Sequence, residues 1–132
     1  PKNILKYINQ YKYSLPESFF NLLFSTLFRY DHEYDNLLVQ ILCRMKSAKW
    51  YMNRLSAQSC TFNEKCAYLL SNFDLTNEQR LWIKDFLLSN MQHIDFMLME
   101  YLFSICLELE RSDVNEIKSA LNTHFPDKEL LI

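Results

Sequence analysis

The chain has 132 residues, and its 49% apolar and 15% aromatic content excludes an intrinsically disordered protein, which would be poor in both. A chain of this length buries about two thirds of the surface that its unfolded form exposes, so it can fold around one core without metal ions or disulfides. The 14 basic and 16 acidic residues give a formal charge of -2, without the basic excess typical of a dedicated nucleic-acid-binding domain.

One helix is expected before Pro16 and another one after it. The helical spacing of apolar residues predicts a short first helix, which carries Ile4, Leu5, Ile8 and Tyr11. Ser14 and Glu17 are spaced as in a capping box, and Pro16 is tolerated in a first turn. A second helix is therefore predicted from there to about Tyr30.

Asp31 is suited to begin a third helix, whose apolar positions are Leu37, Leu38, Ile41, Leu42 and Met45. Ser47 is expected to mark a kink or a restart into a segment that contains Trp50 and Leu55. Two more capping boxes then predict the next two helices. Both of these helices end on a Ser-Asn pair, and their boxes are Thr61 with Glu64 and Thr76 with Gln79.

The longest apolar stretch, Ile94 to Leu109, is interrupted by Asp95, Glu100 and Glu108. It is shorter than the roughly 20 residues needed to span a bilayer. Apolar side chains occur nearly all round the helix that it would form, so this helix is expected to be buried among others.

Asp113 with Glu116 is expected to cap the next helix, and Pro126 to begin a last turn. Glu108 and Glu110 add to an acidic group at the same place in the chain. Carboxylates near a helix N-terminus are favoured by the helix dipole, so this group needs no catalytic role.

These elements predict an all-α fold of six to eight short antiparallel helices without a sheet, because no stretch alternates between apolar and polar residues. Two arrangements stay open, a compact bundle and a stack of helical hairpins, which would be a fragment of an α-solenoid. The recurrence of Tyr68-Leu-Leu-Ser-Asn72 as Phe86-Leu-Leu-Ser-Asn90 is a weak sign of the stack. Residues 1–132 are expected to be a single domain excised from a longer protein, since the chain begins at Pro1 without Met.

The sequence contains no Gly, where average usage of about 7% would give roughly nine. Phosphate-binding loops, dinucleotide fingerprints and nucleophile elbows all require Gly and are therefore excluded as motifs. We expect no enzymatic activity, no cofactor and no small-molecule substrate.

The four cysteines are Cys43, Cys60, Cys66 and Cys106, and nothing resembling a signal peptide precedes them. They form no Cys-x-x-Cys pair, so we expect reduced thiols in an intracellular protein, cytoplasmic or nuclear. A Cys–His nucleophile is not expected, because Cys106 looks buried and lacks an electropositive setting. A zinc site would have to be assembled across the fold, and no spacing points to such a set as Cys60, Cys66, His93 and His124.

The one local concentration of basic and aromatic residues is the segment 44–54. Lys46, Trp50 and Arg54 are four residues apart, so they share a face if the segment is helical. Such a face fits phosphate, nucleic acid or an acidic peptide, with an aromatic ring stacked on a base or held against Arg. A solvated helix face whose aromatic rings turn into the core is the simpler interpretation.

The aromatic and Met content is heavier than a core of this size needs, and exposed aromatic residues form docking sites. The leading hypothesis is therefore a non-catalytic protein–protein interaction or scaffold domain, an adapter whose partner is another protein or the rest of the parent chain. Trp, Tyr and Arg dominate binding hot spots. The residues expected to bind the partner are Arg44, Lys46, Lys49, Trp50, Tyr51, Arg54 and Trp82.

Two alternatives stay open. A nucleic-acid-associated helical domain would use the basic-aromatic segment 44–54, and its binding would weaken steeply with salt. A small helical regulator, of the cell-death or host-modulating type, would take a partner helix into an apolar groove. No membrane partner is expected.

Overall fold

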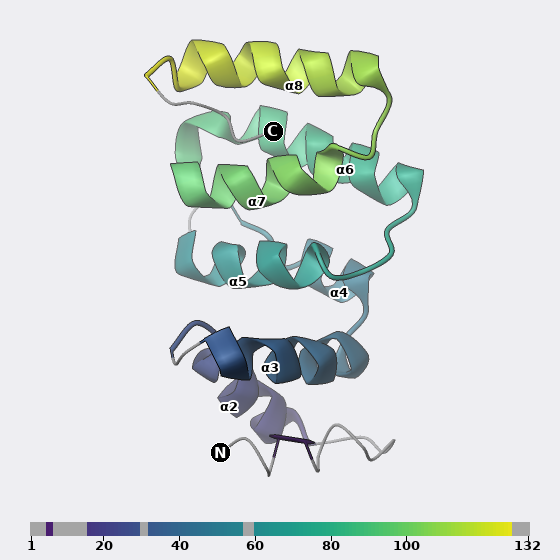
Figure 1. Ribbon diagram of the computed structural model, residues 1–132, viewed down its shortest axis with the longest axis vertical. Coiled ribbons are helices and arrows are strands. Elements are labelled where there is room, and N and C mark those ends of the chain that lie inside the picture. The colour runs from purple at the N-terminus through teal and green to yellow at the C-terminus, as the bar shows by residue number, and fades with distance from the viewer. Residues whose placement is uncertain (1–4, 7–15, 30–31, 57–59, 128–132) are drawn as a thin grey trace.

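The computed structural model describes residues 5–6, 16–29, 32–56 and 60–127, and this part of the chain contains seven α-helices and no strand (Figure 1). The all-α class predicted from the sequence is confirmed. In chain order the helices are α2 (Glu17–Thr26), α3 (His32–Met45), α4 (Ala48–Met52), α5 (Cys60–Leu70), α6 (Asn77–Ser89), α7 (Phe96–Cys106) and α8 (Arg111–His124). A single 3-10 turn, η1 (Met91–His93), joins α6 to α7.

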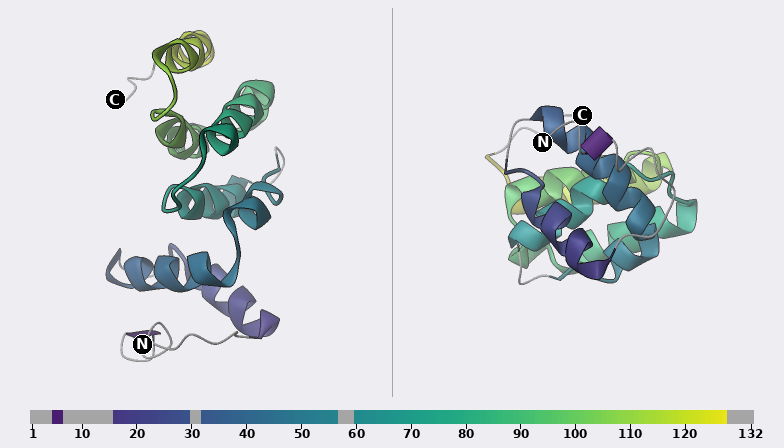
Figure 2. Two further views of the ribbon diagram at one scale, coloured as in Figure 1. Left: turned by 90° about the vertical axis from the view of Figure 1, so that its right-hand side faces the viewer. Right: turned by 90° about the horizontal axis from the view of Figure 1, so that it is seen from below.

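The helices are stacked in layers along the long axis of the molecule, in the order of the sequence (Figure 1). Helices α2, α4 and α6 form one side of the stack, α3, α5 and α7 form the other, and α8 covers the end (Figure 2). The principal contacts join helices that are neighbours or next but one in the chain, such as α4 with α5 and α5 with α7. This is the order of stacked helical hairpins rather than of helices gathered around one axis.

The core runs through every layer of the stack. Fully buried apolar side chains come from α3, α5, α6, α7 and α8 and from the residue after α2, and among them are Leu27, Leu38, Ile41, Leu69, Ile83, Leu87, Leu98, Leu102, Ile117 and Leu121. Burying one such side chain contributes about 1.5–3 kcal/mol to folding. The layers are therefore held to each other by apolar packing, without a metal or disulfide among the described residues.

Two of the predicted helix starts are confirmed by their hydrogen bonds. The backbone N–H of Gln79 donates to Thr76 Oγ1 at 3.1 Å, and the N–H of Thr76 donates to Gln79 Oε1 at 3.0 Å, which completes the capping box of α6. Ser47 restarts the chain as predicted, because its Oγ accepts from the N–H of Trp50 at 3.1 Å and caps α4.

Two other predicted capping boxes are wrong. Helix α5 already includes Cys60, so Thr61 lies inside the helix and cannot cap it. Helix α8 begins at Arg111, and the carboxylates of Asp113 and Glu116 bind Lys84 of α6 instead of the backbone of their own helix. In both cases the helix starts before the residue that the motif selects.

The buried helix predicted from Ile94 to Leu109 is confirmed in kind but is shorter, and it spans Phe96–Cys106. It starts at Phe96 because the Asp95 carboxylate accepts the N–H of Leu98 at 2.8 Å and caps it. Part of the surface of α7 remains in contact with water, since Met97 is 54% exposed.

Helix α2 ends earlier than the expected Tyr30. Its last helical residue is Thr26, because Leu27 has an extended ψ of 133° and Phe28 takes a left-handed φ of 70°. In a chain without Gly, Phe28 adopts the conformation that Gly usually supplies after a helix. The turn brings the Phe28 ring against aromatic rings of α5 and α7.

Several predictions lie outside the described residues. They are most of the first helix, Ser14 of the first capping box, Asp31 as a helix start, and the residues beyond Asp127. Among the helices that the structure does describe, none combines the length and apolar character that a membrane crossing requires.

Candidate partner-binding surfaces

The basic-aromatic segment is divided between two helices. Helix α3 ends at Met45 and α4 begins at Ala48, so the segment is not the continuous helix on which its shared face was predicted. Lys46, Trp50 and Arg54 of this segment nevertheless contact one another. Lys46 Nζ lies 5.0 Å and Arg54 Cζ 4.4 Å from the centre of the Trp50 ring, which places two cations over one indole.

Part of this segment serves the fold itself. Lys46 Nζ is 2.8 Å from the Glu17 carboxylate and 5.3 Å from the Phe20 ring, and both partners belong to α2. Phe20 also meets the edge of Trp50 at 5.2 Å. Lys46 and Trp50 therefore hold α2 against α4, while Arg44, Lys49 and Arg54 are exposed.

Tyr51 is not the exposed anchor that the sequence predicts. Its side chain is completely buried, and its hydroxyl donates to the carbonyl of Leu42 at 2.6 Å. The ring packs against Trp50 and Phe73. Burial raises the pKa of the phenol far above its ordinary value, so Tyr51 remains a neutral donor inside the core.

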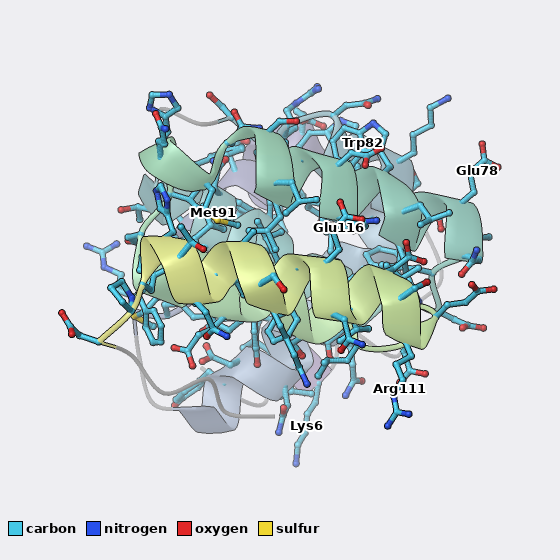
Figure 3. All side chains as sticks on the ribbon, turned by 90° about the horizontal axis from the view of Figure 1, so that it is seen from above. Lys6, Glu78, Trp82, Met91, Arg111 and Glu116 are labelled. Atoms are coloured by element: carbon cyan, nitrogen blue, oxygen red, sulfur yellow. The ribbon has the colours of Figure 1, made fainter. Side chains whose placement is uncertain are left out.

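Trp82 is the exposed aromatic residue of the predicted set. It is 41% exposed, and its ring is stacked on Phe86 with 5.9 Å between centroids and 12° between planes. Figure 3 shows Trp82 on the side of α6 turned away from α8. It lies in a different layer from Trp50, but both helices belong to the side formed by α2, α4 and α6, which we call the tryptophan side.

A second cluster, which sequence reasoning missed, lies where the α2–α3 turn meets α5 and α7. The Phe28 ring is 5.1 Å from Tyr68 and 6.4 Å from Tyr101, and the two tyrosines are 5.8 Å apart, all between centroids. Phe28 is 38% exposed and both tyrosines are partly exposed. These residues are far apart in the sequence, and only the stacking of layers brings them together.

Asp35 contacts this aromatic group, and other carboxylates lie near enough to affect the pKa of one of its tyrosines. Buried Asp35 accepts the N–H of Phe28 at 3.4 Å. Partial burial and then a hydrogen bond to Asp95 raise the pKa of the Glu64 carboxyl. The pKa of Tyr101 is raised by burial and then by neighbouring groups, which include Glu64, Glu100 and Asp35. We call the three rings with Asp35, Glu64, Asp95 and Glu100 the acid-aromatic cluster.

Lys84 forms the main ionic contact between α6 and α8. Its ammonium donates to Asp113 Oδ1 at 2.8 Å and to Glu116 Oε1 at 3.0 Å. The Lys84 side chain is only 10% exposed. Figure 3 shows Glu116 on the side of α8 that faces α6. Asp113 and Glu116 of the predicted acidic group are thus explained by helix packing.

The residues considered for zinc or nucleophilic chemistry are not gathered into one site. His93 and His124 line an open pocket of about 480 Å³ between the ends of α6 and α8, whereas Cys66 is buried in α5. Burial raises the thiol pKa to about 11 at Cys43 and about 12 at Cys66 and Cys106. In the described ranges no group of three or more His, Cys, Asp or Glu is placed to hold a metal ion.

The chain matches no protein-family model, and the comparisons with curated proteins and with solved structures found no match. The tryptophan side is formed by α2, α4 and α6, whereas Tyr68 and Tyr101 belong to α5 and α7, which are helices of the other side of the stack (Figure 2).

Proposed function

We propose that this chain is a non-catalytic interaction or scaffold domain that binds another protein through its tryptophan side. The observation that carries the proposal is the exposed ring of Trp82, which is stacked on the partly buried Phe86 of the same helix, α6. A large aromatic side chain that no other helix of the described chain covers leaves apolar area in water. Contact with a partner removes that area from water and stabilises the complex.

The geometry of the pair suits a binding hot spot. Because Trp82 is stacked on Phe86, its ring is already oriented before a partner arrives, and little side-chain freedom is lost on binding. Tryptophan is also the residue type most enriched among side chains that dominate binding energy. Truncation of such a residue commonly costs about 2 kcal/mol or more of binding free energy.

The basic residues of the same side act at its rim. Lys49 and Arg54 are exposed, and Arg54 lies over Trp50. Exposed charges at a rim mainly raise the association rate and choose the sign of the partner's charge. An acidic patch on the partner protein is therefore the complement that we propose.

An intracellular location, cytoplasmic or nuclear, belongs to the same proposal. Cys43, Cys66 and Cys106 are free thiols, which persist in a reducing compartment. Their raised pKa values keep them protonated at neutral pH and make them poor nucleophiles. This chemistry supports a binding role over thiol catalysis.

The test is quantitative affinity capture from cell extract with the wild-type chain and two variants. Trp82→Ser removes the exposed indole, and Met97→Ser removes a side chain of comparable exposure, 54%, from the other side of the stack. Each capture is repeated at low and high salt and after nuclease treatment. Circular dichroism verifies that both variants are folded.

We expect proteins that wild type and Met97→Ser capture equally and that Trp82→Ser loses, independently of nuclease. Equal capture by both variants would remove Trp82 from the interface and contradict the proposal. Capture that disappears with nuclease and falls steeply with salt would assign binding to nucleic acid through Lys49 and Arg54 instead.

A further inference from the structure

The tryptophan side carries exposed charges of opposite sign in two successive layers. On α6, Glu78, Trp82 and Asp85 are exposed, and their helical spacing places them on one face. The exposed indole is therefore flanked by two carboxylates. In the layer of α4, the exposed charges are those of Lys49 and Arg54, and both are positive.

These four charges have no ion-pair partner in the described part of the chain. They are Lys49, Arg54, Glu78 and Asp85. By contrast, Lys46 and Lys84, which hold helices together, are paired with carboxylates. The guanidinium of Arg54 is already oriented, because its Cζ lies 4.4 Å from the centre of the Trp50 ring. Its N–H groups are therefore available to a carboxylate of another molecule.

The same separation of charge extends along the whole chain. Residues 1–66 contain nine basic and five acidic residues, whereas residues 67–132 contain five basic and eleven acidic residues. The layers follow the order of the sequence, so the stack has a basic part that includes α4 and an acidic part that includes α6 (Figure 1). Two copies that lie side by side in opposite directions place unlike charges against each other.

We propose that the tryptophan side binds a second copy of this chain, which lies in the opposite direction, so that α4 of each copy faces α6 of the other. A two-fold axis that lies in the interface, across the stack and midway between these two layers, produces this pairing. Lys49 and Arg54 then face Glu78 and Asp85 of the second copy, and symmetry forms each contact twice. The inference rests on the proposed function, because it names the partner of the surface proposed there.

The apolar and charged residues of this interface have different roles. Contact with the second copy removes both Trp82 rings from water, and this burial supplies affinity. Exposed ion pairs each contribute little to affinity, but like charges in contact are strongly unfavourable. The charges therefore select the direction in which the two copies lie.

The test measures the number of copies per particle in the purified chain by sedimentation equilibrium, over a range of concentrations and at low and high salt. One double variant, Lys49→Glu with Arg54→Glu, gives the α4 layer the negative charge that α6 already has. A second, Glu78→Lys with Asp85→Lys, gives α6 the positive charge of the α4 layer. An equal mixture of the two variants restores unlike charges in both contacts of a mixed dimer.

The matched control is Arg29→Glu with Arg111→Glu. It changes the net charge as much as the first double variant does, at exposed positions outside α4 and α6. Figure 3 shows Arg111 on the side of α8 turned away from α6. Circular dichroism verifies that every variant is folded.

We expect the wild-type chain to form dimers at low salt and to dissociate as salt screens the exposed charges. Each double variant alone should associate at least about a hundredfold more weakly, because like charges then face each other. The equal mixture should form a dimer with about the wild-type dissociation constant, and the control should dimerise as the wild type does.

Any of four results would overturn the inference. They are a wild-type chain that stays a single copy at every concentration, a mixture that associates no better than its components, an equally weakened control, and assemblies that grow beyond two copies. The last result would show a head-to-tail contact in place of a two-fold one. The capture of a different protein through Trp82 is measured separately, so the proposed function can stand when this inference fails.

Discussion

At the scale of single residues, Lys84 shows how this fold accommodates a mostly buried charge at a low cost in folding free energy. Its four-carbon stem is buried in the α6–α8 contact, and its ammonium meets two carboxylates. Asp113 is 24% and Glu116 60% exposed, so the ionic group lies at the edge of the core, where water screens part of the attraction. The contact of Lys84 with Asp113 and Glu116 therefore orients α8 on α6 as well as contributing to its stability.

Replacement of Lys84 by Met should lower the free energy of unfolding by about 1–2 kcal/mol, since two charge-assisted hydrogen bonds are lost while the apolar stem is kept. Urea denaturation measures the change. Lys49→Met is the control, because it removes the same charge from an exposed position and should change stability by less than about 0.5 kcal/mol.

The pH dependence of this difference has a fixed sign. Hydrogen bonds to Asp113 and then to Glu116 raise the pKa of Lys84 above its ordinary value of 10.5, although burial opposes them. A raised pKa stabilises the folded state below pH 10.5 and loses that contribution as the pH climbs beyond it. The gap between wild type and Lys84→Met should therefore be constant from neutral pH to about pH 10 and shrink above it. A gap that widens there would contradict the pairing.

The cysteine thiols give a second prediction at this scale. Burial holds the pKa of Cys43 near 11 and those of Cys66 and Cys106 near 12, so almost no thiolate is present at pH 8. In a Cys60→Ser variant, a disulfide reagent such as Ellman's should label no thiol of the folded protein within minutes and all three in denaturant. Rapid labelling of the native variant would show that one of these thiols is accessible.

At the scale of elements, two similar capping motifs show that the motif alone does not determine where a helix begins. Thr76 is the N-cap of α6 and closes both hydrogen bonds of its box, whereas Thr61 has the same motif but lies inside α5. The two motifs differ only in their last residue, which is Glu64 after Thr61 and Gln79 after Thr76.

The two threonines should respond differently to the same substitution. Thr76→Ala should lower the free energy of unfolding by about 1 kcal/mol, because the first turn of α6 loses its cap. Thr61→Ala should leave stability unchanged or raise it by a few tenths of a kcal/mol, because Ala is the better helix former at an exposed helical position. Thermal or urea unfolding measures both, and an equal loss in the two variants would contradict the assigned helix start.

At the scale of the whole molecule, local chemistry predicted the helices better than it predicted the surfaces. Apolar periodicity and the absence of Gly were sufficient for the all-α class, because both act within one helix. They did not predict that Tyr51 is buried and Trp82 exposed, since both are aromatic residues on helices and only packing distinguishes them.

The acid-aromatic cluster lay beyond sequence reasoning for the same reason. The three rings come from different layers: Phe28 follows α2, Tyr68 belongs to α5 and Tyr101 belongs to α7. No spacing in the chain relates them. The basic-aromatic segment was found because its residues are close in sequence. Its contacts with Glu17 and Phe20 of α2, which assign it partly to the core, are long-range and were not predicted.

The central claim is that this chain is a layered stack, in which each helix depends on the helices of the neighbouring layers. Hydrogen exchange of the Lys84→Met variant, followed residue by residue against wild type, tests it most directly. Because the principal contact of α8 is with α6, we predict that protection falls in α8 and α6 and changes little in α2 and α3. An equal fall in all helices would show a single cooperative bundle and contradict the layered account.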